Sequence, residues 1–129
     1  MTYFVDTNLF IATIVDEPEL GPLATEVLSS DHHFLTSVLN LMELRTVLTK
    51  KQRMEPDRAQ EIQSEITADI DVIIPDASDV MQANRIQQET LLYPLDSLIL
   101  ACARAHDATL VSFDSELLDA GATHPEDVP

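Results

Sequence analysis

Four acidic side chains stand out because each lies within an apolar stretch of the sequence. They are Asp6, Glu43, Asp96 and Asp114. Charged groups are rarely buried without a partner or a metal ion, and the chain has too few basic residues to neutralise all four. Carboxylates held close together repel one another, and a hard divalent cation removes that repulsion. The pattern therefore predicts a Mg²⁺ site, with Mn²⁺ as the other ion that suits oxygen ligands.

A divalent cation held by carboxylates points to hydrolysis of a phosphodiester. Such an ion lowers the pKa of a bound water and holds a phosphate during displacement. We therefore expect the four acids to be both metal ligands and catalytic residues, with water or hydroxide as the nucleophile.

Three of the four acids also have a purely structural explanation. Asp6 and Asp114 could each cap a following helix, which is worth about 1 kcal/mol. Asp96 could interact with the dipole of a first helical turn, worth about 0.3–1 kcal/mol. Glu43 has no capping role on an apolar helical face, so it is the hardest to explain without a metal.

The elements that must position these acids alternate between short apolar strands and helices. We expect strands at Thr2–Val5, Phe34–Thr36, Asp71–Ile74 and Thr109–Val111. We expect helices at Leu9–Val15, Glu19–Ser29, Val38–Lys51, from Pro56 onward, at Asp76–Leu91 and at Pro94–Ala105. In the helix that begins at Pro56, Ile62, Ile66 and Ile70 share one face. In Asp76–Leu91, we expect Val80, Ala83 and Ile86 to point inward. The alternation predicts an α/β fold of three layers, α/β/α, around a central parallel sheet of four to five strands.

The predicted fold brings the acids to one place. Ligand sites of open α/β sheets lie beyond the carboxyl ends of the strands. Asp6 and Asp114 directly follow strands there, and Asp96 opens a helix that could begin at the same edge. We expect one domain over residues 1–129, with a short edge strand possible within Ala122–Pro129.

Composition bounds the setting in which the protein works. The chain has 23 acidic against 7 basic residues and a net charge of −16. This acidity suggests a halophilic source, an archaeon in our prediction, because salt at about 1 M shortens the screening length to about 3 Å; an acidic mesophilic protein is the other explanation. A single cysteine, Cys102, the absence of a basic leader and the absence of any apolar run of about 20 residues predict a cytoplasmic protein with no membrane span.

Three segments resemble the PIN-domain family, and within it the VapC-type toxins of toxin–antitoxin pairs. The segments are FVDTNLFIA, SVLNLMELRTVL and PLDSLILACARAHDATLVSFDSELL. The resemblance implies a Mg²⁺-dependent endoribonuclease that cleaves single-stranded RNA, often tRNA or mRNA, and is inhibited by a cognate antitoxin. It also implies a homodimer. It assigns the four acids to the family's acidic positions, places Asn8 and Ser112 at supporting polar positions, and puts Glu116 where many members carry Asp.

The basic residues are concentrated in one segment, since five of the seven fall within residues 45–58. The candidates for RNA contact are Arg45, Lys50, Lys51 and Arg53, which could bind phosphates near the acids. Alternatively, Lys50, Lys51 and Arg53 could simply complement the carboxyl end of a helix. Both explanations stay open at this stage.

Other functions fit the sequence less well. A phosphoacceptor domain or a haloacid-dehalogenase-like phosphatase would need a lysine late in the chain, and none follows Lys51. The latter would also want an Asp at the position of Asn8. Glycine-rich phosphate loops are excluded, because the chain has only two glycines. The main alternative is a catalytically inactive PIN-like module that binds RNA or regulates.

Overall fold

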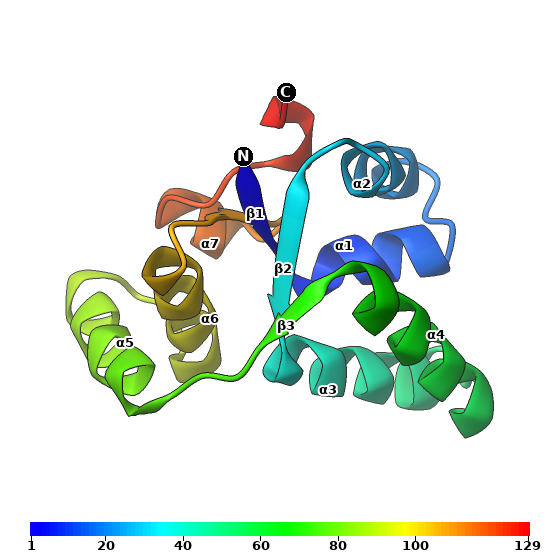
Figure 1. Ribbon diagram of the computed structural model, residues 1–129, viewed down its shortest axis with the longest axis horizontal. Coiled ribbons are helices and arrows are strands. Elements are labelled where there is room, and N and C mark those ends of the chain that lie inside the picture. The colour runs from blue at the N-terminus through cyan, green and yellow to red at the C-terminus, as the bar shows by residue number, and fades with distance from the viewer.

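A four-stranded parallel sheet forms the centre of the protein (Figure 1). The computed structural model describes all 129 residues, Met1–Pro129. The strands are β1 (Thr2–Val5), β2 (His33–Ser37), β3 (Asp71–Ile73) and β4 (Thr109–Val111), in the order β3-β2-β1-β4. All three pairings are parallel, which confirms the predicted α/β class.

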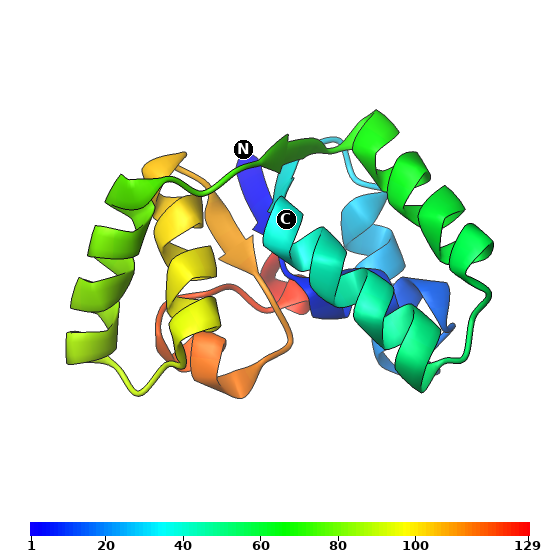
Figure 2. The same cartoon turned by 90° about the horizontal axis from the view of Figure 1, so that it is seen from below.

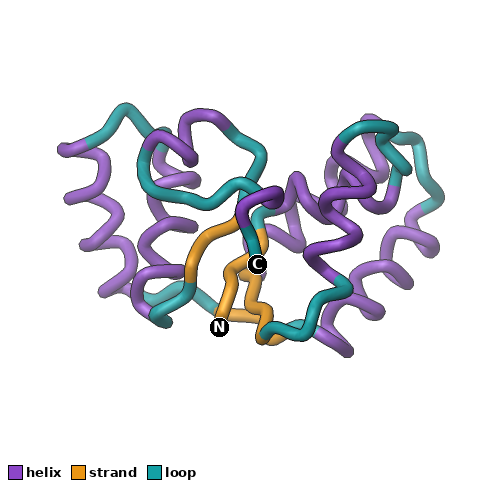
Figure 3. The backbone as a smooth tube through the Cα atoms, turned by 90° about the horizontal axis from the view of Figure 1, so that it is seen from above, coloured by secondary structure: helices purple, strands orange, loops and turns teal.

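Helices cover both faces of this sheet. One face packs against α1 (Thr7–Ile14), α2 (Leu20–Leu28), α3 (Val38–Thr46) and α4 (Pro56–Asp69), and the other against α5 (Ala77–Glu89), α6 (Pro94–Ala105) and α7 (Ser115–Asp119). Figures 2 and 3 show these two groups on either side of the strands. Successive residues of a strand point to opposite faces, so Tyr3 and Val5 belong to one core and Phe4 to the other. The result is the three-layer arrangement expected.

The connections of β1 create a switch point in the sheet. The chain runs outward from β1 to β2 and β3, and then crosses back to place β4 on the other side of β1. Crevices beyond the carboxyl ends of the strands at such a reversal are the usual ligand sites of open α/β sheets. Here, the segments that leave β1 and β4 contain Asp6 and Asp114.

The carboxyl-terminal segment contributes one bridge rather than a full strand. Thr123 pairs in parallel with Val111, and its amide donates to the carbonyl of Leu110 at 2.7 Å. A 3₁₀ turn, η2 (Pro125–Asp127), follows directly. The short edge strand considered for Ala122–Pro129 is thus reduced to a single position.

Several element boundaries differ from those expected. Helix α1 starts at Thr7 because Asp6 caps it. The segment Val38–Lys51 is helical throughout, but its last part is a π-helical turn, η1 (Val47–Lys51), closed by the amide of Gln52 on the carbonyl of Val47 at 3.1 Å. Strand β3 ends one residue early, and α5 is shorter than the predicted Asp76–Leu91.

The inward orientation predicted for Val80 is wrong. Val80 is 47% exposed, whereas Asp79 is 5% exposed. The side chain of Asp79 accepts the amide of Asp76 at 2.9 Å in a capping box that opens α5. Asp79, Ala83 and Ile86 lie at the i, i+4 and i+7 positions of one helical face, and Val80 lies about 100° away from that face.

Helix α6 is the most deeply buried helix of its layer. A continuous run from Ile99 to Ala103 is buried, so Cys102 belongs to the core. Burial, together with the nearby carboxylate of Asp79, raises the pKa of the Cys102 thiol to about 12. No helix of the protein, α6 included, combines the length and apolar character needed to cross a membrane.

Candidate active site

Asp6 is the most buried of the four acids, with 7% of its surface exposed. It ends β1 and caps α1, and its Oδ1 accepts the amide of Thr7 at 2.9 Å. Its Oδ2 accepts the hydroxyl of Ser112 at 2.7 Å and the side-chain amide of Asn8 at 3.3 Å. These donors hold the carboxylate in one orientation at the switch point of the sheet.

Asn8 and Ser112 connect the segment after β1 to the segment after β4. The amide of Asn8 donates to Ser112 Oγ at 3.0 Å, and its Oδ1 accepts the amide of Phe113 at 3.3 Å. Ser112 Oγ also accepts the amide of Asp114 at 3.0 Å. Both residues, singled out from the sequence as supporting positions, therefore lie directly against Asp6.

Asn40 is a third side-chain contact of this carboxylate, and sequence reasoning missed it. The residue is fully buried, and its Nδ2 donates to Thr7 Oγ1 at 3.0 Å and to Asp6 Oδ1 at 3.4 Å. Its Oδ1 accepts the hydroxyl of Ser37 at 2.5 Å. A signal was available, because Asn40 interrupts the same apolar run that drew attention to Glu43, three residues earlier.

The acids interact electrostatically. Burial raises the pKa of Asp6 from 3.8 to about 6; the hydrogen bonds from Ser112 and Thr7 oppose this rise, and the charges of Glu43 and Asp96 add to it. Burial also raises the pKa of Asp96, and so do the charges of Asp114, Glu43 and Glu116. The structure thus brings the four predicted acids and Glu116 into one field of negative charge.

The exposure of the acids corrects part of the sequence argument. Glu43 is exposed on α3, and its neighbour Met42 is 65% exposed, so the apolar surroundings inferred for Glu43 are wrong. Of the apolar residues in that run, only Leu41 and Leu44 are buried. Asp96 and Asp114 are partly buried. The structural roles are also present, since Asp114 caps α7 through the amide of Glu116 at 2.9 Å and Asp96 lies in the first turn of α6.

The acid cluster offers only carboxylate oxygens, a ligand type that hard divalent cations accept. No Lys, Arg or His forms an ion pair with any of these five carboxylates. No three Asp, Glu, His or Cys side chains lie close enough to hold an ion among them. Mg²⁺ is commonly held by one or two carboxylates, with water and substrate phosphate as the other ligands. The structure therefore does not place the four predicted metal ligands around one point, and one or two of these carboxylates could ligate such an ion directly.

The basic candidates lie farther along the helix that carries Glu43. Exposed side chains at Arg45, Lys50, Lys51 and Arg53 occupy the end of α3, η1 and the turn that follows. None of them forms an ion pair, whereas Arg58 on α4 pairs with Glu61 at 3.0 Å and Glu65 at 3.5 Å.

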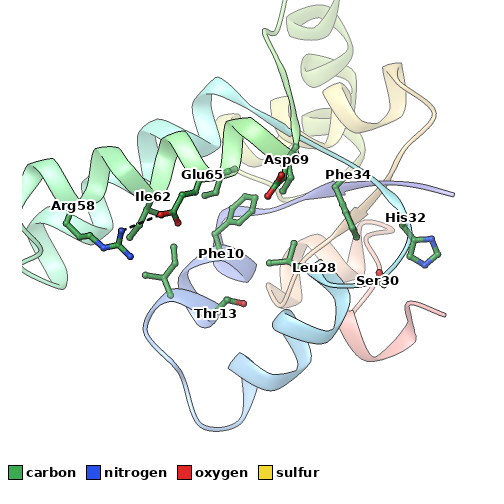
Figure 4. A pocket seen from close by; sticks show the side chains of 13 residues that line it. Phe10, Thr13, Leu28, Ser30, His32, Phe34, Arg58, Ile62, Glu65 and Asp69 are labelled. Atoms are coloured by element: carbon green, nitrogen blue, oxygen red, sulfur yellow. Dashed lines mark ion pairs between the residues drawn. The ribbon is translucent and has the colours of Figure 1, made fainter.

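A groove of about 540 Å³ lies away from the acids, between α1, α2, β2 and α4. Figure 4 shows Phe10, Phe34 and Ile62 among its lining residues, with Arg58 and Glu65 at one side. None of the predicted acids lines it, so it is separate from the site at the carboxyl ends of the strands.

Comparison with known proteins agrees with the fold. The family model described as "PIN domain" matches residues 3–122. No curated protein matches the chain. Among solved structures, a toxin–antitoxin complex from Klebsiella pneumoniae superposes with a TM-score of 0.77 at 19% identity, covering 98% of this chain and 99% of that one.

Two further solved structures are similar over nearly their whole length. VapC20 of Mycobacterium tuberculosis, described as a sarcin-ricin loop cleaving toxin, has a TM-score of 0.78 at 22% identity and covers 95% of this chain and 97% of its own. FitAcB from Neisseria gonorrhoeae has a TM-score of 0.74 at 17% identity and covers 99% and 100%. At these identities the likeness concerns the fold.

Proposed function

The chain belongs to the PIN-domain family, and we propose that it is a divalent-metal-dependent endoribonuclease, the toxin of a type II toxin–antitoxin pair. The observation that carries the proposal is the environment of Asp6. A buried carboxylate at the switch point is held by Ser112, Asn8, Asn40 and Thr7, and its nearest charges are negative.

This environment is costly in the absence of a cation. A carboxyl with a raised pKa keeps its proton more readily, and its acidic neighbours add repulsion rather than relief. The four hydrogen-bond donors nevertheless orient both oxygens of Asp6. An arrangement that fixes a repelled carboxylate is expected where a cation is to be bound, since fixed ligand geometry is what a metal site needs.

The chain's own residues then have distinct tasks. Asp6 would bind Mg²⁺ or Mn²⁺ directly, and Asp96, Glu43 and Asp114 would ligate it or hold its water ligands. When bound, such an ion lowers the pKa of water and offsets negative charge on the scissile phosphate. Asn8 and Ser112 keep Asp6 oriented. Glu116 adds negative charge beside Asp96, which strengthens the attraction for a cation.

The test is cleavage of a single-stranded RNA with Mg²⁺ or Mn²⁺, compared with EDTA. Asp6→Asn and Asp96→Asn should each abolish cleavage while the protein stays folded. Asp79→Asn is the matched control, because Asp79 is an acidic residue that caps α5 outside the acid cluster. Cleavage that persists in EDTA, or full activity in both site variants, would overturn the mechanism.

An inactive PIN-like module that binds RNA or regulates is the alternative. In that case RNA binding would persist with no cleavage by the wild-type chain in either metal. The carboxylates oppose this alternative, because a module without catalysis has no use for a cluster of mutually repelling acids.

Partners and setting are part of the proposal. The similar solved structures include toxin–antitoxin complexes, which supports a protein antitoxin for this chain. Co-expression with a small protein encoded beside it tests that partner, and a retained one-to-one complex is expected. Light scattering tests the homodimer, for which the exposed apolar side chains of Met42, Ile74 and Met81 offer surface. We also propose that the protein works in the cytoplasm of a halophile.

A further inference from the structure

Most of the Lys and Arg side chains that form no ion pair lie within residues 45–53. We propose that Arg45, Lys50, Lys51 and Arg53, here called the basic arm, bind the phosphates of a single-stranded RNA as it passes the acid cluster. The identity of the polyanion as RNA rests on the proposed function. The assignment of these four residues rests on their charge, pairing and backbone geometry.

The first observation is that the basic arm is left unneutralised. With 23 acidic residues in the chain, a cation that served only the fold would readily find an acidic partner. Arg58, nearby in sequence, does so twice, with Glu61 and Glu65. The four side chains of the basic arm are exposed and form no ion pair. They are therefore free to neutralise phosphates.

The second observation is the position of the basic arm relative to the acids. α3 and η1 form one continuous helical segment, and Glu43 lies on it two residues before Arg45. At 1.5 Å per residue, Lys50 lies about 10 Å along the axis from Glu43. Figure 2 shows α3 running outward from the strands with α4 beside it. A strand of RNA at the acids can thus reach the arm within a few nucleotides.

The third observation concerns the backbone of Arg53. Its φ of 54° lies in the left-handed region, and it directly follows the last helical turn. Glycine is the residue preferred at that position, and an ordinary side chain there costs about 1 kcal/mol or more. The equivalent positions after α1, α6 and α7 carry Asp16, Asp107 and Gly121. Arginine here is therefore not required by the turn, and its charge needs another explanation.

Interaction with the helix dipole does not explain the whole arm. The dipole effect is confined to the last turn of a helix. Lys50 and Lys51 lie in that turn, but Arg45 precedes it and Arg53 lies beyond it. All four share their exposure and their place along one segment, so an RNA strand that follows this segment could contact them in turn.

The experiment measures binding of a fluorescein-labelled single-stranded RNA of about 20 nucleotides in EDTA, so that no cleavage occurs. Arg53→Gly removes one charge and relieves the backbone, so it should fold at least as well as the wild type. A triple variant adds Lys50→Gln and Lys51→Gln. Arg85→Gln is the matched control, because Arg85 is an exposed, unpaired cation on α5.

We expect the triple variant to bind at least about tenfold more weakly at ~0.1 M salt. The slope of log affinity against log salt should become shallower by about 0.7 for Arg53→Gly and by about 2 for the triple variant. Arg85→Gln should leave both unchanged. Equal losses in Arg85→Gln and Arg53→Gly would show a general charge effect and overturn the proposal, as would wild-type binding by the triple variant.

Two further outcomes separate this inference from the proposed function. If binding depends on the basic arm but no metal-dependent cleavage occurs, the inference about the arm stands and the proposed nuclease function is wrong. If cleavage depends on Asp6 but binding does not depend on the arm, the nuclease function stands and the inference about the arm is wrong. If the triple variant instead loses self-association in light scattering and keeps its RNA affinity, the arm contacts protein and the inference is wrong.

Discussion

Ser112 donates its hydroxyl hydrogen to Asp6 Oδ2 across 2.7 Å, although 106 residues separate the two in the chain. The contact exists because β4 returns to lie beside β1, so that the residues following both strands meet. It is the shortest hydrogen bond to the Asp6 carboxylate, and it lowers the pKa of that carboxyl against the effect of burial.

Removal of this hydroxyl should therefore shift the pH dependence of the enzyme. In Ser112→Ala the pKa of Asp6 should rise above its present value of about 6, because a hydrogen bond to the charged form is lost. The acid limb of the pH–rate profile should then move to higher pH, and carbon NMR should show the same direction for Asp6 in the metal-free protein. Ser115→Ala is the control, since Ser115 is exposed. An unmoved acid limb would contradict this role for Ser112.

The burial of Asp6 also links stability to pH. The pKa of Asp6 is about 6 in the folded protein, and its ordinary value of 3.8 applies to the unfolded chain. The folded state therefore holds the proton more tightly than the unfolded state. The resulting stabilisation is complete below about pH 4 and is lost as pH rises through about 6. Asp6→Asn should thus increase the free energy of unfolding by up to about 3 kcal/mol at pH 7, and by little at pH 4. Asparagine also caps helices well, so α1 should be retained.

Urea unfolding of the two proteins in EDTA at several pH values measures this difference. Addition of Mg²⁺ should stabilise the wild type and leave Asp6→Asn unaffected, because a cation binds the ionised carboxylate. If Asp6→Asn increases the free energy of unfolding by the same amount at pH 4 and pH 7, the titration of Asp6 is not the cause of the increase.

Asn40 should matter for both folding and activity. Asn40→Ala removes the donor to Thr7 and Asp6 and leaves the hydroxyl of Ser37 without its acceptor, in a fully buried place. The expected cost is about 1–3 kcal/mol of stability, and cleavage should fall because Asp6 loses part of its support. Asn84→Ala, the same change at an exposed position of α5, should be close to neutral. If the two variants unfold at the same urea concentration, the network around Asn40 contributes nothing.

The fold could be predicted from the sequence because each apolar strand is short and each is followed by a capping residue. Asp6 and Asp114 could be placed for the same reason, since a residue that follows a parallel strand has only one edge to occupy. Periodicity was less informative where apolar residues occur on both sides of a helix. Val80 is exposed on such a helix, and its neighbour Asp79 is buried instead.

The contacts within the site could not be predicted in this way. The bond between Asn40 and Thr7 joins positions 33 residues apart, and nothing in a single sequence specifies that pairing. The exposure of Glu43 depends on which face of α3 turns toward Leu44 and the core, and a run of apolar residues leaves that choice open. The π-helical turn at Val47–Lys51 likewise could not be predicted from the spacing of apolar residues.

The charge of the whole molecule predicts a dependence of stability on salt. At a net charge of −16 the folded chain repels itself, and raising KCl from about 0.1 M to about 1 M shortens the screening length from about 10 Å to about 3 Å. The melting temperature should therefore rise by several degrees over this range. A variant with Glu26→Gln, Asp31→Asn and Asp69→Asn removes three exposed charges away from the acid cluster. It should melt higher than the wild type in low salt and gain less from KCl. Because both proteins share the same core, an effect of KCl on hydrophobic burial would raise the two melting temperatures equally. An equal rise would show that self-repulsion is not the cause.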